Sequence, residues 1–351
     1  MSLLALEVEG LRCLAPTRLE LHPHVNLVTG ANGAGKTSLL EAIYLLGRGR
    51  SFRTRLTERL IAHQAESLMV FGRTDDSTFP TVGLGFHRKD GLRARVAGRD
   101  AKSLAELSEA FPVQAVDPGI HRLVEEGPTH RRRWLDWGVF HVEPGFVAAW
   151  SDYARTLRQR NAALKSGGDP GPWEPELVRL GTLLSAARTR TMALLEPYWQ
   201  QTLAAVLGEP VTLGYYQGWS QERGLAESFA THRERDAERG STGTGAHRFD
   251  VQLRIDGRAV REVLSRGQQK LLGAALALSM ARLAGSEDRR PPTLLLDDPA
   301  AELDREHTDA LVSEIRKMKG QLIVTALHSQ EGRFGTPDKA FHVEHGRVAT
   351  L

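Results

Sequence analysis

Cysteine is almost absent from this sequence, and several other features are missing with it. Cys13 is the only cysteine among 351 residues, which excludes a disulfide framework and a cysteine-rich zinc site. Neither sign of charge dominates, because 46 Lys and Arg residues face 43 Asp and Glu residues and leave a net charge of +3. No run of about 18 uninterrupted apolar residues occurs, so no transmembrane helix is expected. With 41% hydrophobic and 25% charged residues and no signal peptide, we expect a folded, soluble and cytoplasmic protein.

The first informative segment joins an apolar run (24–29), a glycine-rich turn and a helical pattern (39–46), the order that a phosphate-binding loop requires. Its glycines allow consecutive backbone N–H groups to turn toward phosphate oxygens, and the following helix adds the positive end of its dipole. Lys36 can then reach the β- and γ-phosphates of a nucleotide, and the Thr37 hydroxyl can bind Mg²⁺. The alternative is a glycine-rich turn without a ligand. The predicted nucleotide-binding loop consists of Gly30, Ala31, Asn32, Gly33, Ala34, Gly35, Lys36, Thr37 and Ser38.

Two carboxylates follow an apolar strand near the other end of the chain. Residues 293–296 predict a buried strand, and Asp297 and Asp298 come directly after it. In a parallel α/β sheet, ligands bind at the carboxyl ends of the strands, where these acids emerge. Asp297 suits the Mg²⁺ shell together with Thr37, and Asp298 is placed to polarise an attacking water. We therefore predict that Lys36, Asp297 and Asp298 are catalytic, although a buried strand running into a polar turn would look similar.

A serine-glycine-glutamine segment precedes a long helical run that ends near Leu283. A serine at the start of a helix offers a hydroxyl, backbone N–H groups and the helix dipole to an anion. The segment resembles the signature motif of ABC-type ATPases, and residues 299–304 resemble their D-loop. The resemblance implies that the signature of one subunit closes on the γ-phosphate held by another, so that ATP is sandwiched in a head-to-tail dimer. The residues implied are Ser265, Gly267 and Gln268.

Between these motifs lies a large insertion. Segments 68–73, 81–87 and 92–96 alternate like strands and predict an antiparallel subsheet. From about residue 144, two helical patterns separated by a Gly/Pro-rich break at 167–172 predict a helical hairpin, and residues 219–248 predict an exposed connector.

The expected fold is therefore α/β: an ABC-type P-loop ATPase head, with a mixed sheet flanked by helices, and an inserted, mainly helical lobe. The expected boundaries are 1–115 for the N-terminal part of the ATPase lobe, 116–244 for the helical insertion and 245–351 for the C-terminal part of the ATPase lobe.

Two clusters of basic residues are candidates for nucleic-acid binding. One follows the first helix and contains Phe52, and the other covers residues 130–134. Arginine forks match phosphate geometry, and an aromatic ring can pack on a sugar or a base. A solvated face, or ion pairs with acids such as Glu58, fits the composition equally well. We predict that the first cluster contacts a nucleic-acid backbone without reading its sequence. Its arginines are Arg48, Arg50, Arg53 and Arg55.

Several motifs in the same order along nearly the whole chain resemble the RecF family of recombination mediators. The most specific are Arg50-Ser51-Phe52-Arg53 and Gln159-Arg160-Asn161. The resemblance implies a slow, DNA-stimulated ATPase that uses ATP and Mg²⁺ and forms an ATP-dependent homodimer. It also implies binding to single-stranded DNA and gapped duplex DNA, and loading of RecA together with RecO and RecR, with no membrane partner.

The same resemblances suggest further site residues. Arg12 is expected to contact the nucleotide, although Leu11 and Cys13 beside it depart from the family pattern. Gln114, which ends an apolar run, is the expected glutamine at the metal and the attacking water. Ala326 stands where ABC ATPases have a switch histidine, so Thr325 or His328 is expected to sense the γ-phosphate.

Two other functions remain open at this point. The nucleotide-binding subunit of an ABC transporter shares the motifs, but its helical insert is usually shorter and Asp298 would more often be Glu. A P-loop kinase for a small molecule shares the glycine loop, but the signature segment and the D-loop have no role in such an enzyme.

Overall fold

The computed structural model describes residues 1–286, 289–299, 301, 303–327 and 334–351. The chain forms two compact units. The first contains Met1–Ile120, Ala205–Leu207 and Ala274–Leu351, and the second contains His121–Ala204 and Gly208–Gly273. The first unit extends to residue 120, five residues beyond the expected boundary at 115. Strand β10 (Asp250–Ile255), which follows the expected return to the ATPase lobe at residue 245, pairs with β9 (Thr212–Tyr216) inside the second unit.

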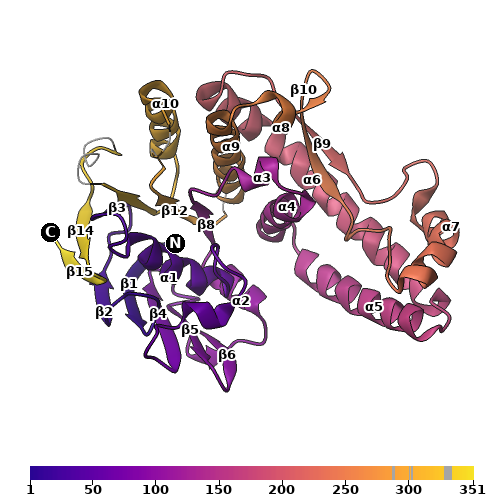
Figure 1. Cartoon of the computed structure of the whole chain (residues 1–351), viewed down its shortest axis with the longest axis horizontal. Helices are drawn as coiled ribbons and strands as arrows, with labels where there is room; N and C mark the ends of the chain where they lie inside the picture. The colour runs from indigo at the N-terminus through magenta and orange to yellow at the C-terminus, as the bar shows by residue number, and fades with distance from the viewer. Residues whose placement is uncertain (287–288, 300, 302, 328–333) are drawn as a thin grey trace. The chain divides into compact units, whose positions relative to one another are not determined.

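The first unit contains a mainly parallel sheet with the strand order β15-β14-β3-β13-β12-β8 (Figure 1). Its central strands β12 and β13 are buried at every residue, which is typical of strands covered on both faces. Because β3, β13 and β12 are adjacent and parallel, the carboxyl ends of β3 and β12 lie at the same edge of the sheet. The strands are β3 (Val25–Thr29), β8 (Val113–Val116), β12 (Thr293–Asp297), β13 (Leu322–Ala326), β14 (Lys339–Glu344) and β15 (Arg347–Thr350).

An antiparallel sheet with the order β2-β1-β4-β5-β6-β7 completes the first unit, and it confirms the predicted antiparallel subsheet. Helix α1 (Lys36–Arg48) contacts strands of both sheets, and its Leu39, Leu40 and Ile43 belong to the buried core. The strands are β1 (Leu3–Glu9), β2 (Thr17–Glu20), β4 (Ser67–Thr74), β5 (Thr81–His87), β6 (Gly91–Val96) and β7 (Arg99–Asp100). The remaining helices are η1 (Thr57–Leu60), α2 (Leu104–Ala110) and α10 (Arg305–Arg316).

The second unit is mainly helical, and it confirms the predicted hairpin of α5 (Phe146–Ser166) and α6 (Glu174–Val206). Gly167 ends α5 in the left-handed conformation, which glycine adopts without steric cost. A small sheet, β11-β10-β9, accompanies the helices. The other elements are α3 (Arg122–Glu125), α4 (Pro128–Val142), η2 (Gly171–Trp173), α7 (Gly224–Arg239), β11 (Arg258–Ala259), α8 (Val260–Val263) and α9 (Arg266–Ala284). Helix α9 begins in the second unit and ends in the first.

The expected exposed connector at 219–248 is wrong. Most of its charged middle forms α7, in which Phe229 and Asp236 are buried. Asp236 accepts a hydrogen bond at 2.9 Å from the buried guanidinium of Arg160 on α5. The polar sequence therefore supplies an internal ion pair instead of a solvated loop. None of the helices in the described part of the chain has the length and apolarity that a membrane span needs.

Candidate nucleotide-binding site

The glycine-rich loop between β3 and α1 has the backbone conformation that its sequence predicts. Gly30 and Gly35 have φ angles of 152° and 120°, which side-chain-bearing residues rarely adopt. A Cβ atom on Gly30 would also lie 2.3 Å from the carbonyl oxygen of Val343 on β14. Glycine is therefore required where the chain leaves the sheet and turns into the first turn of α1. This turn points the backbone N–H groups at the start of the helix toward the carboxyl edge of the sheet.

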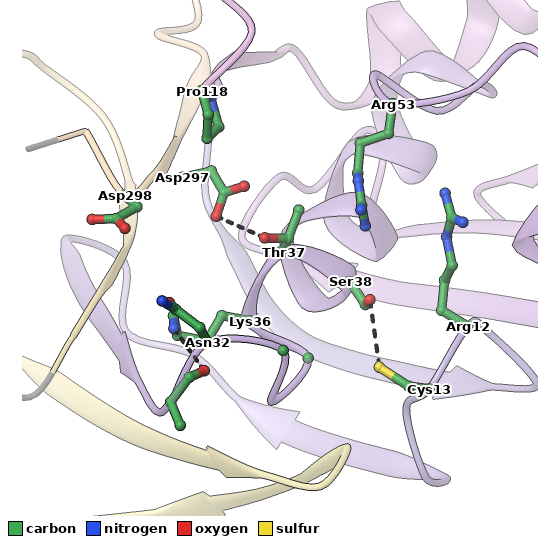
Figure 2. Close-up of a pocket in the computed structure, with 13 residues that line it drawn as sticks. Arg12, Cys13, Asn32, Lys36, Thr37, Ser38, Arg53, Pro118, Asp297 and Asp298 are labelled. Atoms are coloured by element: carbon green, nitrogen blue, oxygen red, sulfur yellow. Dashed lines mark hydrogen bonds between the residues drawn. The ribbon is translucent and has the colours of Figure 1, made fainter. Parts of the chain in front are cut away.

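A cavity of about 560 Å³ lies against this loop, a size typical of ligand pockets (Figure 2). It brings together the loop and the two carboxylates at the carboxyl end of β12, as the sequence predicts. Of the loop, Gly30 and Ala34 are the residues that do not line it. The cavity also includes three residues that we did not expect there, Cys13, Pro118 and Arg53. The residues that line it are Arg12, Cys13, Ala31, Asn32, Gly33, Gly35, Lys36, Thr37, Ser38, Arg53, Pro118, Asp297 and Asp298.

The Lys36 ammonium folds back over the loop. Its Nζ donates hydrogen bonds to the carbonyl oxygens of Gly30 (2.7 Å) and Ala31 (3.0 Å), and the residue is buried. Burial lowers the pKa of Lys36, while the negative charges of Asp298 and Asp297 act to raise it. A cation is thus held beside the loop, where it can exchange carbonyl oxygens for phosphate oxygens.

Thr37 and Asp297 point toward each other, and Thr37 Oγ1 donates to Asp297 Oδ1 at 3.1 Å (Figure 2). No cluster of three or more His, Cys, Asp or Glu residues that would suit a metal occurs in the described residues. Mg²⁺ usually takes only one or two protein oxygens and completes its shell with water and phosphate oxygens. The hydroxyl and the carboxylate therefore fit a Mg²⁺ ion that binds together with a nucleotide.

Asp298 follows with a φ of 46°, which is a strained, left-handed conformation for a residue with a side chain. Its N–H donates to Thr325 Oγ1 at 2.9 Å, and Thr325 Oγ1 donates to Asp297 Oδ1, also at 2.9 Å. Thr325 is fully buried in β13, so its expected role as a sensor of the γ-phosphate is wrong. Its register opposite Asp297 directs the hydroxyl to the neighbouring strand. His328, the other candidate, lies outside the described residues, as do Ala300 and Glu302 of the expected D-loop.

Gln114, the glutamine expected at the metal and the attacking water, does not line the cavity. Gln114 pairs with Leu294 in the parallel register of β8 and β12, three residues before Asp297. Three residues of strand cover about 10 Å, so Gln114 lies too far back along the sheet. Pro118, just after the end of β8, lines the cavity instead. The short apolar run before residue 114 did not reveal where the strand ends.

Two arginines of the cavity wall depend on one buried carboxylate, Glu41 of α1. Arg12 binds Glu41 with two hydrogen bonds, from Nε to Oε2 (2.8 Å) and from Nη2 to Oε1 (3.0 Å). Ser51 Oγ donates to Glu41 Oε1 and accepts from the backbone N–H of Arg53 (2.9 Å). Sequence reasoning missed Glu41, although a lone acid within the apolar run 39–46 was a usable signal.

The basic cluster 48–55 divides between two environments. Arg53 lines the nucleotide cavity, whereas Arg50 and Arg55 are exposed and form no ion pair within the described residues, with Glu58 or any other acid. The Arg48 guanidinium lies 5.6 Å from the centre of the Tyr44 ring. The DNA-binding role of the four arginines stays a prediction.

In the second basic cluster, residues 130–134, two residues have structural roles. Arg131 forms a bidentate ion pair with Asp250, with both hydrogen bonds at 2.9 Å, and Trp134 is buried.

The signature segment lies in the second unit, at the start of α9. Ser265 and Gln268 form a reciprocal capping box, in which the Ser265 N–H donates to Gln268 Oε1 at 3.0 Å and the Gln268 N–H donates to Ser265 Oγ at 3.4 Å. Ser265 is exposed, and a Cβ on Gly267 would meet open space. An anion can therefore approach this helix start from solvent, and its binding to a nucleotide stays a prediction.

Comparisons with known proteins agree with this architecture. A family model described as RecF/RecN/SMC N terminal domain matches residues 2–347. The chain is 39% identical to the DNA replication and repair protein RecF of Stutzerimonas stutzeri, covering 100% of this chain and 98% of that protein. It is 38% identical to RecF of Pseudomonas aeruginosa, covering 99% of this chain and 98% of that protein.

Solved structures confirm the predicted fold class. The structure of the recombination mediator protein RecF-ATP in the RecFOR pathway matches with a TM-score of 0.88 and 26% identity, over 100% of this chain and 97% of that chain. An Smc head bound to the C-winged helix domain of ScpA matches with a TM-score of 0.62 and 16% identity, over 100% and 98%, which supports the fold alone. From its sequence, its fold and the arrangement of its phosphate-binding loop, the chain belongs to the RecF family of DNA replication and repair proteins.

Proposed function

We propose that this protein binds ATP with Mg²⁺ in the cavity of the first unit and hydrolyses it slowly to control its binding to DNA. The main support for this proposal is that the glycine-rich loop and the two carboxylates, which lie at opposite ends of the chain from each other, line a single cavity. The solved RecF-ATP relative supports ATP as the nucleotide.

Each side chain has a distinct task in this hydrolysis. Lys36 exchanges its bonds to loop carbonyls for bonds to the β- and γ-phosphates, and Thr37 and Asp297 hold the Mg²⁺, which offsets phosphate charge when bound. Asp298 orients a water for attack on the γ-phosphorus, and the bond to the β–γ bridging oxygen breaks to release ADP and phosphate. The geometry supports positioning rather than covalent catalysis, because no nucleophilic side chain is needed for this transfer.

The ATP sandwich is the second part of the proposal. The start of α9 offers an exposed serine, free backbone approach and the helix dipole, which together suit the γ-phosphate bound by a second copy. ATP would then stabilise the dimer, because it binds the closed pair better than the open one.

Sedimentation tests this dimer. Asp298→Asn, which should retain ATP without hydrolysing it, should sediment as a dimer with ATP and as a monomer without it. Ser265→Arg in the same background should stay monomeric, because a bulky cation blocks the approach of the partner's nucleotide. A monomer at saturating ATP in the Asp298→Asn protein alone would contradict the sandwich.

DNA is the proposed macromolecular ligand. The exposed Arg50 and Arg55 suit a phosphate backbone, and family membership supports a role in DNA replication and repair. We further propose single-stranded and gapped duplex DNA as substrates, and RecR with RecO as partners in loading RecA, as the RecFOR pathway of the solved relative suggests.

The ATPase rate with and without gapped DNA, measured across protein concentration, tests these proposals together. Gapped DNA should raise the rate, and a rate that rises with the square of protein concentration would identify dimer assembly as the limiting step. A rate per protein that is independent of concentration and of DNA would contradict both the dimer and the DNA-gated activity.

The transporter and kinase alternatives receive less support. The identity to RecF over the whole chain favours a DNA-processing protein over a transporter subunit. A kinase would not need the start of α9, so full ATP turnover by Ser265→Arg would favour that alternative.

A further inference from the structure

The carboxylate pair of the nucleotide site depends on a residue outside the cavity. Thr325 is fully buried in β13, and its Oγ1 lies between the backbone N–H of Asp298 and the side chain of Asp297. It does not line the cavity, so it has no direct contact with a bound nucleotide.

The direction of each hydrogen bond follows from the chemistry of a hydroxyl, which has one proton to donate and lone pairs to accept. Asp298 N–H can only donate, so Thr325 Oγ1 accepts from it at 2.9 Å. Two acceptors then compete for the Thr325 proton: Asp297 Oδ1 at 2.9 Å and the Leu296 carbonyl oxygen at 3.5 Å. The shorter, charge-assisted bond is much the stronger, so the proton points to the carboxylate.

The two partners of Thr325 have different tasks. Asp297 Oδ1 receives a second hydroxyl, that of Thr37, so both bonds hold the same oxygen of the proposed metal ligand. Asp298 has the strained φ of 46°, a conformation that costs about 1–3 kcal/mol and persists only where neighbouring groups enforce it. The hydrogen bond from its own N–H is one such constraint.

We propose that Thr325 is a positioning residue for ATP hydrolysis, because its hydroxyl links the backbone of Asp298 to the carboxylate of Asp297. The link holds the group that orients water at a constant separation from the group that holds the metal. The inference rests on the proposed ATPase function, and it adds a residue of β13 that acts only through the two acids.

Thr325→Val tests this link, because valine keeps the branched shape of threonine and removes the hydroxyl. Small displacements of reacting groups can reduce rates by about 10²-fold, so we expect kcat to fall roughly 10- to 100-fold with less than about a threefold change in ATP affinity. Thr325→Ser keeps the hydroxyl and should restore kcat to within about threefold of the unmodified protein.

A matched control exists on the adjacent strand. Thr293 is also fully buried, but its hydroxyl donates to Gln321 Oε1 at 3.2 Å at the opposite end of β12 from the acids. Thr293→Val should therefore leave kcat unchanged, which separates the loss of any buried hydroxyl from the loss of this one.

A second readout needs neither metal nor nucleotide. In the ligand-free protein, amide hydrogen exchange of a peptide containing Asp298 should be faster in Thr325→Val than in Thr325→Ser, because the N–H has lost its acceptor. If the valine variant is unstable, Thr325→Ala, which also lacks the hydroxyl, replaces it in this comparison with Thr325→Ser.

Three results would overturn the inference: an unchanged kcat in Thr325→Val, an equal loss in the valine and serine variants, or equal exchange of the Asp298 amide in both. Failure of the proposed function looks different. An unmodified protein whose ATP turnover equals that of Lys36→Ala would contradict the ATPase, and amide exchange would still decide whether Thr325 holds the two acids.

Discussion

The guanidinium of Arg160 offers the sharpest test of what holds the second unit together. It is fully buried on α5, and Nη1 donates to Asp236 Oδ2 (2.9 Å) and Thr242 Oγ1 (2.7 Å). Nη2 donates to Glu174 Oε1 at 3.0 Å, and the guanidinium lies 4.9 Å from the centre of the Phe229 ring. One side chain thus connects α5, the start of α6, α7 and the segment after α7.

Replacing Arg160 with Met keeps most of the volume and removes the charge. Glu174 retains an ion pair with Arg233 at 2.5 Å, but Asp236, which is 1% exposed, loses its only ion pair within the described residues. Removing one partner of a buried pair costs about 3–5 kcal/mol, because the remaining charge stays desolvated. We therefore expect Arg160→Met to lower the free energy of unfolding of the second unit by about 3–5 kcal/mol. The double variant Arg160→Met/Asp236→Leu should recover much of this loss, because it leaves no buried charge of the pair behind.

Tryptophan fluorescence during urea denaturation measures this unit selectively, because all six tryptophans lie in it. Arg179→Met is the matched control, since Arg179 forms an exposed ion pair with Glu176 on α6 and its loss should not change the midpoint measurably. A loss below about 1 kcal/mol for Arg160→Met would refute the reasoning, as would a double variant that loses the sum of the two single losses.

Three further predictions address pH, nucleotide binding and DNA binding. Burial lowers the pKa of His247 to about 4, and its Nδ1 and Nε2 lie 3.0 Å from Tyr153 Oη and 3.1 Å from the Thr242 carbonyl oxygen. The unfolded chain binds this proton near pH 6.5 and the folded chain does not, so the stability of the second unit should fall by about 2 kcal/mol from pH 7 to pH 5. His247→Gln should remove that part of the pH dependence of the urea midpoint, and an unchanged pH profile would contradict the buried neutral imidazole. Glu41→Gln should weaken ATP binding about tenfold in calorimetry, because the charge-assisted pair that orders Arg12 in the cavity wall is lost. An unchanged affinity would show that the order of this wall does not contribute to ATP binding. The double variant Arg50→Ala/Arg55→Ala should reduce the slope of log affinity for DNA against log salt by about one unit per lost contact. Arg53→Ala should mainly weaken ATP binding, because Arg53 lines the cavity. A reduced salt slope in Arg53→Ala and an unchanged slope in the double variant would show that DNA binds at the cavity wall instead.

Much of the site was predictable because its signal is local. The loop from Gly30 to Ser38 specifies its own backbone path through glycines that tolerate unusual φ angles, and its flanking strand and helix follow from short apolar patterns. The same holds for the hairpin of α5 and α6 and for the antiparallel strands, whose periodicity lies within each segment. The pairing of Asp297 with the loop needed one further rule, that ligands bind at the carboxyl ends of parallel strands.

Other features depended on contacts between distant segments, and only the tertiary structure decided them. The positions of Gln114 and Thr325 relative to the cavity are examples, because the register of β8 and β13 against β12 sets them and no single segment encodes that register. Arg53 lines the cavity and Arg50 does not. The difference depends on Ser51, whose hydroxyl donates to Glu41 and accepts from the backbone N–H of Arg53. The polar stretch around Asp236 packs into the second unit because Asp236 accepts a hydrogen bond from Arg160. The local sequence does not predict this contact, since Arg160 lies 76 residues earlier in the chain. A local pattern reports the preferences of the residues within it, whereas a buried charge or a strand register is decided by whichever distant residue completes its hydrogen bonds.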